Sequence, residues 1–308
     1  KQLLTRLLSV ISYGRRAYAE MILENSLPGF LYLVTGMNHT FRLKVKRDEK
    51  TSSVTVQGMR GTLSGGRIFA HERAPFSMVS HEGGRVVRLV INSFGQRAAF
   101  TKFVDDAMEK MKAHPPELLL IDLRFNMGGN SQLGDYLIGK LFKGSWSQAL
   151  KVSLKVSRDV RSRYKNLPAV KGAPDGAVVD LFSWKGPRRP LERRWFKGQM
   201  GLLTGPFTFS SGVLFAALFK NFGLGRISGE ETGGLANHFG DVVSFTLPHS
   251  KLTLKVSHKR FVTDPEAQGG VVPHFHVTPG KTGLLKTKKA YMNEIFSNYL
   301  PRKKHVHP

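Results

Sequence analysis

The first sixty residues show two different hydrophobic periodicities. From residue 2 to about residue 25, apolar positions recur with helical spacing along one stripe, which predicts an amphipathic helix ended by Pro28. Two runs of alternating polar and apolar residues follow, 40–45 and 53–56, and the polar turn 48–50 joins them. These two runs predict a β-hairpin.

From residue 85 onward, short apolar runs alternate with longer segments of helical spacing. The run Leu118–Asp122 is apolar at successive positions, which is typical of a strand buried on both faces. The segment 60–85 is Gly-rich and irregular, so we expect a domain boundary there. The expected strands are 86–91, 118–122, 199–203, 226–228, 242–247 and 252–256, and the expected helices are 100–113, 132–142 and 211–222. This order predicts an α/β core with partly parallel strands.

These patterns divide the chain into three parts. Residues 1–75 hold the helix and the hairpin, residues 76–290 hold the α/β core, and residues 291–308 form a basic C-terminal tail. Within the core, the segment 151–199 interrupts the alternation, so we interpret it as an insertion or a lid. The chain begins with Lys1 and not with Met, which predicts a processed or trimmed product.

Composition and charge narrow the classes of function. The chain has 308 residues and no cysteine, which excludes disulfides, thiolate zinc sites and a cysteine nucleophile. Its net charge of +25 would attract nucleic acid, anionic lipid or acidic proteins. Residues 151–199 hold 13 Lys or Arg, interleaved with Pro, Gly and aromatic residues, and no zinc-finger, basic-zipper or RNA-recognition signature accompanies them. We therefore interpret most of this charge as solvated surface and not as a nucleic-acid site.

Two adjacent glycines follow the predicted strand that ends at Asp122. Backbone N–H groups at the carboxyl end of a strand can bind a developing oxyanion, and Gly128 and Gly129 would let a substrate approach them closely. The alternative is a tight turn into the next helix, in which Asp122 and Arg124 form a structural ion pair.

A serine stands where a second buried strand leads into an apolar helix. Ser210 would lie at the N-terminus of that helix, where the dipole and the free N–H groups favour negative charge. Serine is also a common N-cap, so the residue by itself leaves both interpretations open. A third segment, the Gly-rich loop Gly229–Gly234, follows a short strand further along the chain.

In this order and at these separations, the three segments resemble the tail-specific (C-terminal processing) protease family, peptidase family S41. That family has an Asp-Leu-Arg-x-Asn-x-Gly-Gly stretch, a nucleophilic serine that opens a hydrophobic helix, and a Gly-Glu-x-Thr-x-Gly loop. The matching segments here are Asp122–Gly129, Ser210–Gly223 and Gly229–Gly234. The resemblance covers roughly residues 85–280, and the hairpin at 40–57 resembles the end of a PDZ-type substrate-binding module.

The resemblance implies a fold, an activity and a set of site residues. The fold would be α/β, a ClpP/crotonase-like spiral core with a small N-terminal helix and hairpin region. The protein would be a serine endopeptidase that cleaves polypeptides through an acyl-enzyme on Ser210, with Gly128, Gly129 and Ser211 forming the oxyanion hole. A register shifted by one residue would make Ser211 the nucleophile. The resemblance implies no cofactor, no metal and an extracytoplasmic (periplasmic or secreted) location.

The general base departs from the family pattern. The best-known members place a lysine just after the Gly-Glu-x-Thr loop, where this chain has Leu235, which cannot accept a proton. One alternative is that His238 is the base. A second is the tricorn-like branch, which uses Ser, His and Glu and for which Glu266 is the candidate. Without a catalytic role, His238 would be a loop histidine on the surface and Glu266 a solvated acid in a turn.

A third alternative is a base in a preceding segment, or no base at all. Without a base, the chain would be a catalytically inactive peptide-binding or scaffold relative. A crotonase-like acyl-CoA enzyme would share the fold and the Gly-lined hole, but the junction between Ser210 and an apolar helix argues against that class.

Overall fold

The structure is a computed structural model that describes residues 2–11, 13–36, 40–47, 50–57, 74–278 and 288–300. The chain forms two compact units, residues 1–73 and 74–308. The sequence predicted a boundary between residues 75 and 76. The predicted strands and helices that follow residue 85 all lie in the second unit.

The first unit holds two helices and a hairpin. They are α1 (Gln2–Ser9), α2 (Arg16–Thr35) and the antiparallel pair β1 (Thr40–Arg47) and β2 (Lys50–Gln57). The hairpin prediction is confirmed. The prediction of a helix ended by Pro28 is wrong, because the chain kinks at Ser26 and the helix then continues through the proline. It ends at Gly36, whose left-handed φ of 69° lets its N–H donate to the carbonyl of Tyr32.

A six-stranded sheet forms the centre of the second unit. Its strands, in sheet order, are β14 (Phe275–His276), β11 (Arg226–Gly229), β10 (Gln199–Thr204), β5 (Leu118–Asp122), β4 (Val86–Ile91) and β3 (Phe76–His81). The first five strands in this order are parallel, and β3 is antiparallel to β4. Because β3 and the short 3-10 helix η1 (Glu82–Gly84) follow residue 75, the prediction of irregular structure up to residue 85 is wrong there. Residues 58–73 lie outside the described residues.

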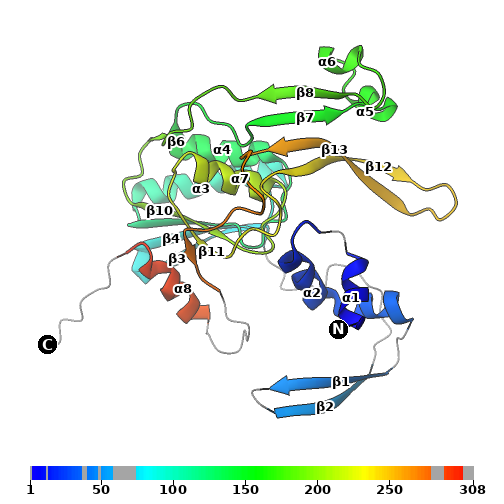
Figure 1. The fold of residues 1–308 in the computed structure, drawn as a ribbon. Helices are drawn as coiled ribbons and strands as arrows, with labels where there is room; N and C mark the ends of the chain where they lie inside the picture. Colours follow the sequence, from blue (N-terminus) through cyan, green and yellow to red (C-terminus); the bar gives the residue numbers. More distant parts are fainter. Residues whose placement is uncertain are drawn as a thin grey trace. The chain divides into compact units, whose positions relative to one another are not determined.

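Helices cover both faces of this sheet (Figure 1). On one face lie α3 (Arg97–Ala113), α4 (Ser131–Leu141) and α7 (Ser211–Asn221), and on the other lies α8 (Lys288–Ser297). Leu119 and Ile121 of β5 belong to the larger core, whereas Leu118 and Leu120 belong to the core with α8. This double burial explains why the strand is apolar at successive positions.

The segment predicted as a basic tail begins as part of a helix. Tyr291, Met292 and Ile295 of α8 are buried against the central sheet. The Tyr299 hydroxyl is 3.0 Å from the Ser228 hydroxyl of β11. The prediction of a tail from residue 291 is therefore wrong up to residue 300, and residues 301–308 lie outside the described residues.

A second sheet of four strands lies in the same unit. Its order is β12 (His238–Thr246), β13 (Thr253–Val262), β7 (Lys151–Lys155) and β8 (Val178–Ser183), with α5 (Arg158–Arg163) and α6 (Pro168–Lys171) between β7 and β8. We call these six elements the outer lobe. A separate antiparallel pair consists of β6 (Phe142–Lys143), which precedes β7 in the sequence, and β9 (Glu192–Arg193), which follows β8. The segment 151–199 thus supplies two strands of a sheet whose other half comes from residues 238–262.

None of the helices in the described ranges has both the length and the apolar character needed to cross a membrane.

Candidate active site

The sheet topology brings the three sequence motifs to one edge. The strands β5, β10 and β11 are parallel neighbours, so their carboxyl ends lie at the same edge of the sheet. The Gly-Gly turn follows β5, Ser210 follows β10, and the loop Gly229–Gly234 begins at the end of β11. Ligand sites in open α/β sheets commonly lie at this edge.

Ser210 has an unusual backbone conformation at the start of α7. Its φ of 49° and ψ of −121° lie outside the regions that L-residues normally occupy, and its side chain makes no capping hydrogen bond to the helix. The Ser210 carbonyl accepts the N–H groups of Val213 and Leu214 at 2.8 and 3.1 Å. The capping interpretation is therefore not realised, and residues held in such conformations cluster at functional sites.

The neighbouring serine has a different environment. Ser211 is 5% exposed, and its hydroxyl donates a 2.6 Å hydrogen bond to the carbonyl of Gly129. This bond ties the first residue of α7 to the Gly-Gly turn. The Ser210 hydroxyl, which is half-buried, makes no hydrogen bond to any described residue. This difference favours Ser210 over Ser211 as the nucleophile.

Both glycines of the turn are required by their surroundings. Gly128 has a φ of 105°, and a Cβ built on it would lie 2.7 Å from the Cβ of Ser210. Gly129 has a φ of 132°, and a Cβ built on it would overlap the carbonyl of Phe94. Any other residue at either position would combine a left-handed backbone with a steric clash. The turn and the candidate nucleophile are thus in direct contact.

The backbone N–H groups around Ser210 differ in whether they already donate a hydrogen bond within the protein. The Gly128 N–H donates to the side-chain oxygen of Asn126 at 2.8 Å. Within the described part of the chain, the N–H groups of Gly129 and Ser211 donate no hydrogen bond. The Ser211 nitrogen lies 3.1 Å from the Cβ position of Gly128, on the side that faces Ser210. Of the three predicted oxyanion donors, Gly129 and Ser211 therefore have a free N–H.

Asn126 holds the turn against the start of α7, a role the sequence analysis missed. Its side chain is fully buried, and its amide group donates to the Ile91 carbonyl at 3.0 Å while its oxygen accepts the Gly128 N–H. Its own carbonyl accepts the N–H of Phe209 at 2.9 Å. The sequence feature that could have identified this role is an amide side chain between a buried strand and two glycines. Because buried polar groups need hydrogen-bond partners, such a side chain is expected to bind the nearby backbone.

A buried ion group supports the strand beneath this turn. The Asp122 carboxylate binds Arg124 through bonds of 2.8 and 2.6 Å and binds Arg88 at 2.7 Å. Burial by itself would raise the pKa of Asp122, but the two guanidinium groups outweigh it and lower the pKa to about 2. The ion pair between Asp122 and Arg124 is therefore present, and Arg88 is a partner that the sequence analysis did not identify.

The third motif packs against the segment that carries Ser210. The Gly234 N–H donates to the Thr208 carbonyl at 3.1 Å, and a Cβ on Gly234 would lie 3.1 Å from the ring of Phe209. The Glu231 carboxylate accepts the N–H of Gly270 at 2.7 Å. The loop thus joins the neighbourhood of Ser210 to the segment that precedes β14.

His238, the first candidate base, begins β12 directly after this loop. The structural reading of a loop histidine is wrong, because the residue is paired with Phe261 of β13 and its ring stacks on that side chain at 5.5 Å. Its Nδ1 lies 3.0 Å from the Leu235 carbonyl. Burial lowers the pKa of His238, and backbone hydrogen bonding only partly opposes this effect. A neutral ring whose Nδ1–H donates to Leu235 has its lone pair on Nε2.

Glu266, the second candidate, lies on the turn after β13 and is exposed. Its backbone N–H donates to the Asp264 carboxylate at 3.1 Å. In the described ranges, neither His238 nor Glu266 is hydrogen-bonded to Ser210. The structure therefore brings Ser210, the two glycines and Ser211 together and leaves the base without a direct contact to the serine.

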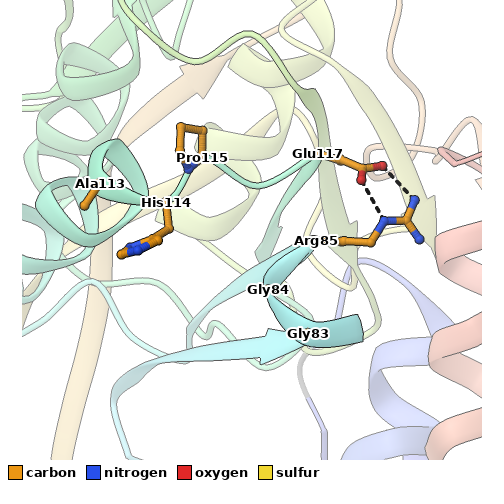
Figure 2. A pocket seen from close by; sticks show the side chains of 7 residues that line it. All are labelled: Gly83, Gly84, Arg85, Ala113, His114, Pro115 and Glu117. Carbon is orange, nitrogen blue, oxygen red and sulfur yellow. Dashed lines mark hydrogen bonds and ion pairs between the residues drawn. The ribbon is translucent and has the colours of Figure 1, made fainter.

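Among the described residues, no three His, Asp or Glu side chains form a group that could hold a metal ion. A surface hollow of about 410 Å³ is lined by residues that include Arg85 and Glu117, which are joined by two 2.7 Å hydrogen bonds (Figure 2). These two residues precede β4 and β5, so the hollow lies at the edge of the sheet opposite to Ser210. It is not part of the candidate active site.

Comparison with known proteins gives one family and several similar structures. Residues 85–277 match the family model described as peptidase family S41. Mature CPAF is 15% identical with a TM-score of 0.58, over 95% of this chain and 73% of that chain. Mature CPAF complexed with lactacystin is 15% identical with a TM-score of 0.57, over 96% and 74%. The photosystem II D1 C-terminal processing protease is 14% identical with a TM-score of 0.38, over 74% and 52%.

No curated protein matches the chain. The family match spans all three motifs on which the resemblance was based, and the resemblance is confirmed. The predicted α/β class is also confirmed, because the mixed helices and sheets are similar to those of the solved CPAF structures.

Proposed function

Because the chain belongs to peptidase family S41, we propose that it is a serine endopeptidase of the tail-specific type that forms an acyl-enzyme on Ser210. The observation that supports this most directly is the contact between Gly128 and Ser210. The contact sets a serine in a strained conformation beside the N–H groups of Gly129 and Ser211, and neither the serine hydroxyl nor these N–H groups has a hydrogen-bond partner among the described residues. Nucleophilic catalysis on an acyl group uses a nucleophile next to such N–H donors.

In the proposed reaction, the Ser210 hydroxyl oxygen attacks the carbonyl carbon of the scissile peptide bond and its proton passes to the base. The resulting oxyanion accepts hydrogen bonds from the N–H groups of Gly129 and Ser211. Collapse of this intermediate breaks the C–N bond, and the base returns the proton to the leaving amine. Water then attacks the acyl-enzyme by the same route and releases the second product.

We propose His238 as the base. Its Nδ1 is held by the Leu235 carbonyl, so that the lone pair on Nε2 is available to accept a proton. Burial keeps the ring neutral near pH 7 because it lowers the pKa. The proposal requires the ring and Ser210 to approach each other when substrate binds, since catalytic hydrogen bonds often form only in the complex. Glu266 would assist the histidine if its carboxylate replaced the Leu235 carbonyl as the acceptor of the Nδ1–H.

The alternative function is an inactive peptide-binding relative. Leu235 occupies the place of the family lysine, and no described side chain with a titratable group is hydrogen-bonded to Ser210. Such a protein would retain the fold and the oxyanion pocket and would bind extended polypeptides without cleaving them.

A fluorophosphonate probe separates these functions, because it labels only an activated serine. We expect the wild type to be labelled and Ser210→Ala to be unlabelled. Ser211→Ala is the matched control, since it keeps the backbone N–H and removes only the bond to Gly129. Labelling of Ser210→Ala but not of Ser211→Ala would identify Ser211 as the nucleophile. A folded wild type that remains unlabelled and still binds peptides would support the alternative.

The remaining assignments follow from the family. The substrate would be a polypeptide, the unit formed by residues 1–73 would contribute to substrate binding, and the protein would act outside the cytoplasm. Fractionation of cells that express the native gene, followed by detection of the chain in each fraction, tests the location. Recovery in the cytoplasm would contradict it.

A further inference from the structure

The strands β12 and β13 form a hairpin that extends away from the central sheet (Figure 1). Cross-strand pairs share one face of a sheet, and here Phe245 is paired with Leu254 and Val243 with Val256. At the turn, the Leu247 N–H donates to the Leu252 carbonyl at 2.9 Å. One face of the hairpin is therefore apolar. We call its distal part the hairpin face, which consists of Phe245, Leu247, Leu252, Leu254 and Val256.

The base of the hairpin is firmly held. Asp241, with a φ of 51°, accepts hydrogen bonds from the Tyr164 hydroxyl at 2.6 Å and from Lys259 at 2.7 Å, and it pairs with Arg163 at 3.0 Å. Val243, on the apolar face next to this base, packs against the small core of the outer lobe. The distal part of the hairpin is thus presented from a fixed base.

The hairpin face is uncovered within the described unit. Its aliphatic side chains are exposed by 38% at Leu247, 66% at Leu252, 48% at Leu254 and 44% at Val256. Contiguous apolar surface that is rimmed by polar residues marks an interaction site. The hairpin face therefore has the features of an interaction site, and the charges around it indicate which kind of partner it would attract.

The charges of the hairpin have one sign. From Val242 to Thr263 the sequence contains no Asp or Glu. Lys251 lies in the turn next to Leu252, whereas Lys255 is paired with Ser244 and lies on the opposite face of the hairpin. The outer lobe, residues 151–183 and 238–262, has eleven Lys or Arg against four Asp. A second copy of a chain with a net charge of +25 would be repelled, whereas an anionic partner would be attracted.

The types of residue distinguish an anionic bilayer from an acidic protein. Protein interfaces are enriched in aromatic residues and arginine and are depleted in lysine. Four of the five residues of the hairpin face are aliphatic, and the fifth is Phe245. Lys251 at the turn can keep its ammonium group among lipid headgroups while the aliphatic residues enter the acyl region. We propose that the hairpin face docks on an anionic lipid surface, with Lys251 binding the headgroups.

Vesicle sedimentation tests this proposal on the full chain with Ser210→Ala, so that turnover does not enter the result. We expect binding to vesicles that contain phosphatidylglycerol and at least tenfold weaker binding to phosphatidylcholine alone. Each lysine near an anionic surface is expected to contribute about fivefold to the affinity. Lys251→Gln should therefore weaken binding about fivefold, and raising the salt concentration should weaken binding further.

The double variant Leu252→Ser and Leu254→Ser should weaken binding at least tenfold. Its control is Val178→Ser on β8, where the replaced side chain is 67% exposed outside the hairpin face. Lys110→Gln on α3 is the control for charge. Equal binding to both vesicle types, or equal losses in the hairpin variants and their controls, would overturn the proposal. So would hairpin variants that bind vesicles normally but bind an acidic polypeptide more weakly.

Discussion

Gly128 approaches Ser210 so closely that a Cβ built on the glycine would lie 2.7 Å from the Cβ of the serine. The two residues are 82 positions apart in the sequence, and parallel pairing of β5 with β10 brings them to the same edge. The contact fixes where the serine hydroxyl stands relative to the N–H groups of Gly129 and Ser211. Small changes at Gly128 should therefore affect catalysis before they affect folding.

The first prediction is that Gly128→Ala lowers kcat/KM at least about 100-fold, the effect of losing one oxyanion donor. The new methyl group must push apart the turn and Ser210, and alanine is also disfavoured at a φ of 105°. Steady-state kinetics on a peptide substrate measures the loss, with circular dichroism to verify the fold. Gly172→Ala, where a Cβ meets nothing within 4 Å, is the control and should behave as the wild type. Equal activity of the two variants would contradict the proposed contact.

The second prediction concerns Asn126, a positioning residue that acts through Gly128 and Phe209. Asn126→Ala removes the bonds to Ile91 and Gly128 and leaves a buried carbonyl and N–H unpaired, which should cost about 2–4 kcal/mol of unfolding free energy. Denaturant unfolding measures this cost. The same variant should lower kcat more than it raises KM, because the oxyanion donors move and the substrate-binding surface does not.

Asn126→Asp is the conservative comparison. It keeps an oxygen acceptor for the Gly128 N–H, replaces the donor to the Ile91 carbonyl with an oxygen, and adds a charge at a buried position, so it should not restore stability. We expect it to recover part of kcat relative to Asn126→Ala. If both variants lost stability but kept the wild-type kcat, Asn126 would have a purely structural role.

The central fold was predictable because its strands and helices are specified by local patterns. Leu118–Asp122 is apolar at each successive position up to its aspartate, and that composition reflects burial on both faces, so its limits in the structure match those predicted. The helix before it ends near two prolines, and Ala113 is its last residue. The N-terminal helix was misjudged because Pro28 follows a kink at Ser26, which removes the conflict that normally ends a helix.

The outer lobe and α8 were harder to predict because distant pairing specifies them. β7 carries two lysines, and its place in a sheet depends on β13, which lies more than 90 residues further along the chain. α8 spans only ten residues, and the sheet face that Tyr291, Met292 and Ile295 cover comes from strands more than 60 residues earlier in the chain. The local sequence does not specify which distant strand either element meets.

The candidate site was predictable to the extent that its motifs are contiguous. The positions of Ser210 and of the two glycines follow from short segments that retain the family pattern. The distinction between the N–H groups of Gly128 and Gly129 required coordinates, because it depends on which way the Asn126 side chain turns. The base remained open because a general base is brought to its serine by tertiary folding and substrate binding, not by its place in the sequence.

The third prediction concerns the ion group of Asp122. The folded pKa of about 2 lies below the value of about 3.9 expected for the unfolded chain. The ionised carboxylate therefore stabilises the fold above about pH 4, and this contribution, about 2–3 kcal/mol, is lost as the pH falls through 2. Unfolding free energies measured between pH 2 and pH 7 should show this slope.

Asp122→Asn should abolish that part of the slope and destabilise the protein by about 3–5 kcal/mol, because Arg88 and Arg124 stay buried without their counter-ion. Other carboxylates also titrate in this range, so the difference between the variant and the wild type isolates Asp122. The matched control is Asp106→Asn, whose partner Lys102 is exposed, and it should cost about 1 kcal/mol or less. Equal slopes in the wild type and Asp122→Asn would show that the carboxylate is not paired in the folded protein.

The last prediction is the pH dependence of catalysis. A base must be neutral to accept the Ser210 proton, and burial lowers the pKa of His238 below its ordinary value of about 6.5. The rate constant kcat/KM should therefore be constant near pH 7 and fall about tenfold per pH unit once the pH is below that lowered pKa. Intrinsic fluorescence recorded over the same range separates this loss from unfolding.

His238→Ala should lower kcat/KM at least about 100-fold and remove the acid limb of the pH profile. His249→Ala, in the exposed turn of the hairpin, should leave both the rate and the pH profile unchanged. An acid limb that survives in His238→Ala would assign proton acceptance to another group, and the chain contains further histidines, His39 and His71 among residues 1–73, on which the same pair of measurements can be made.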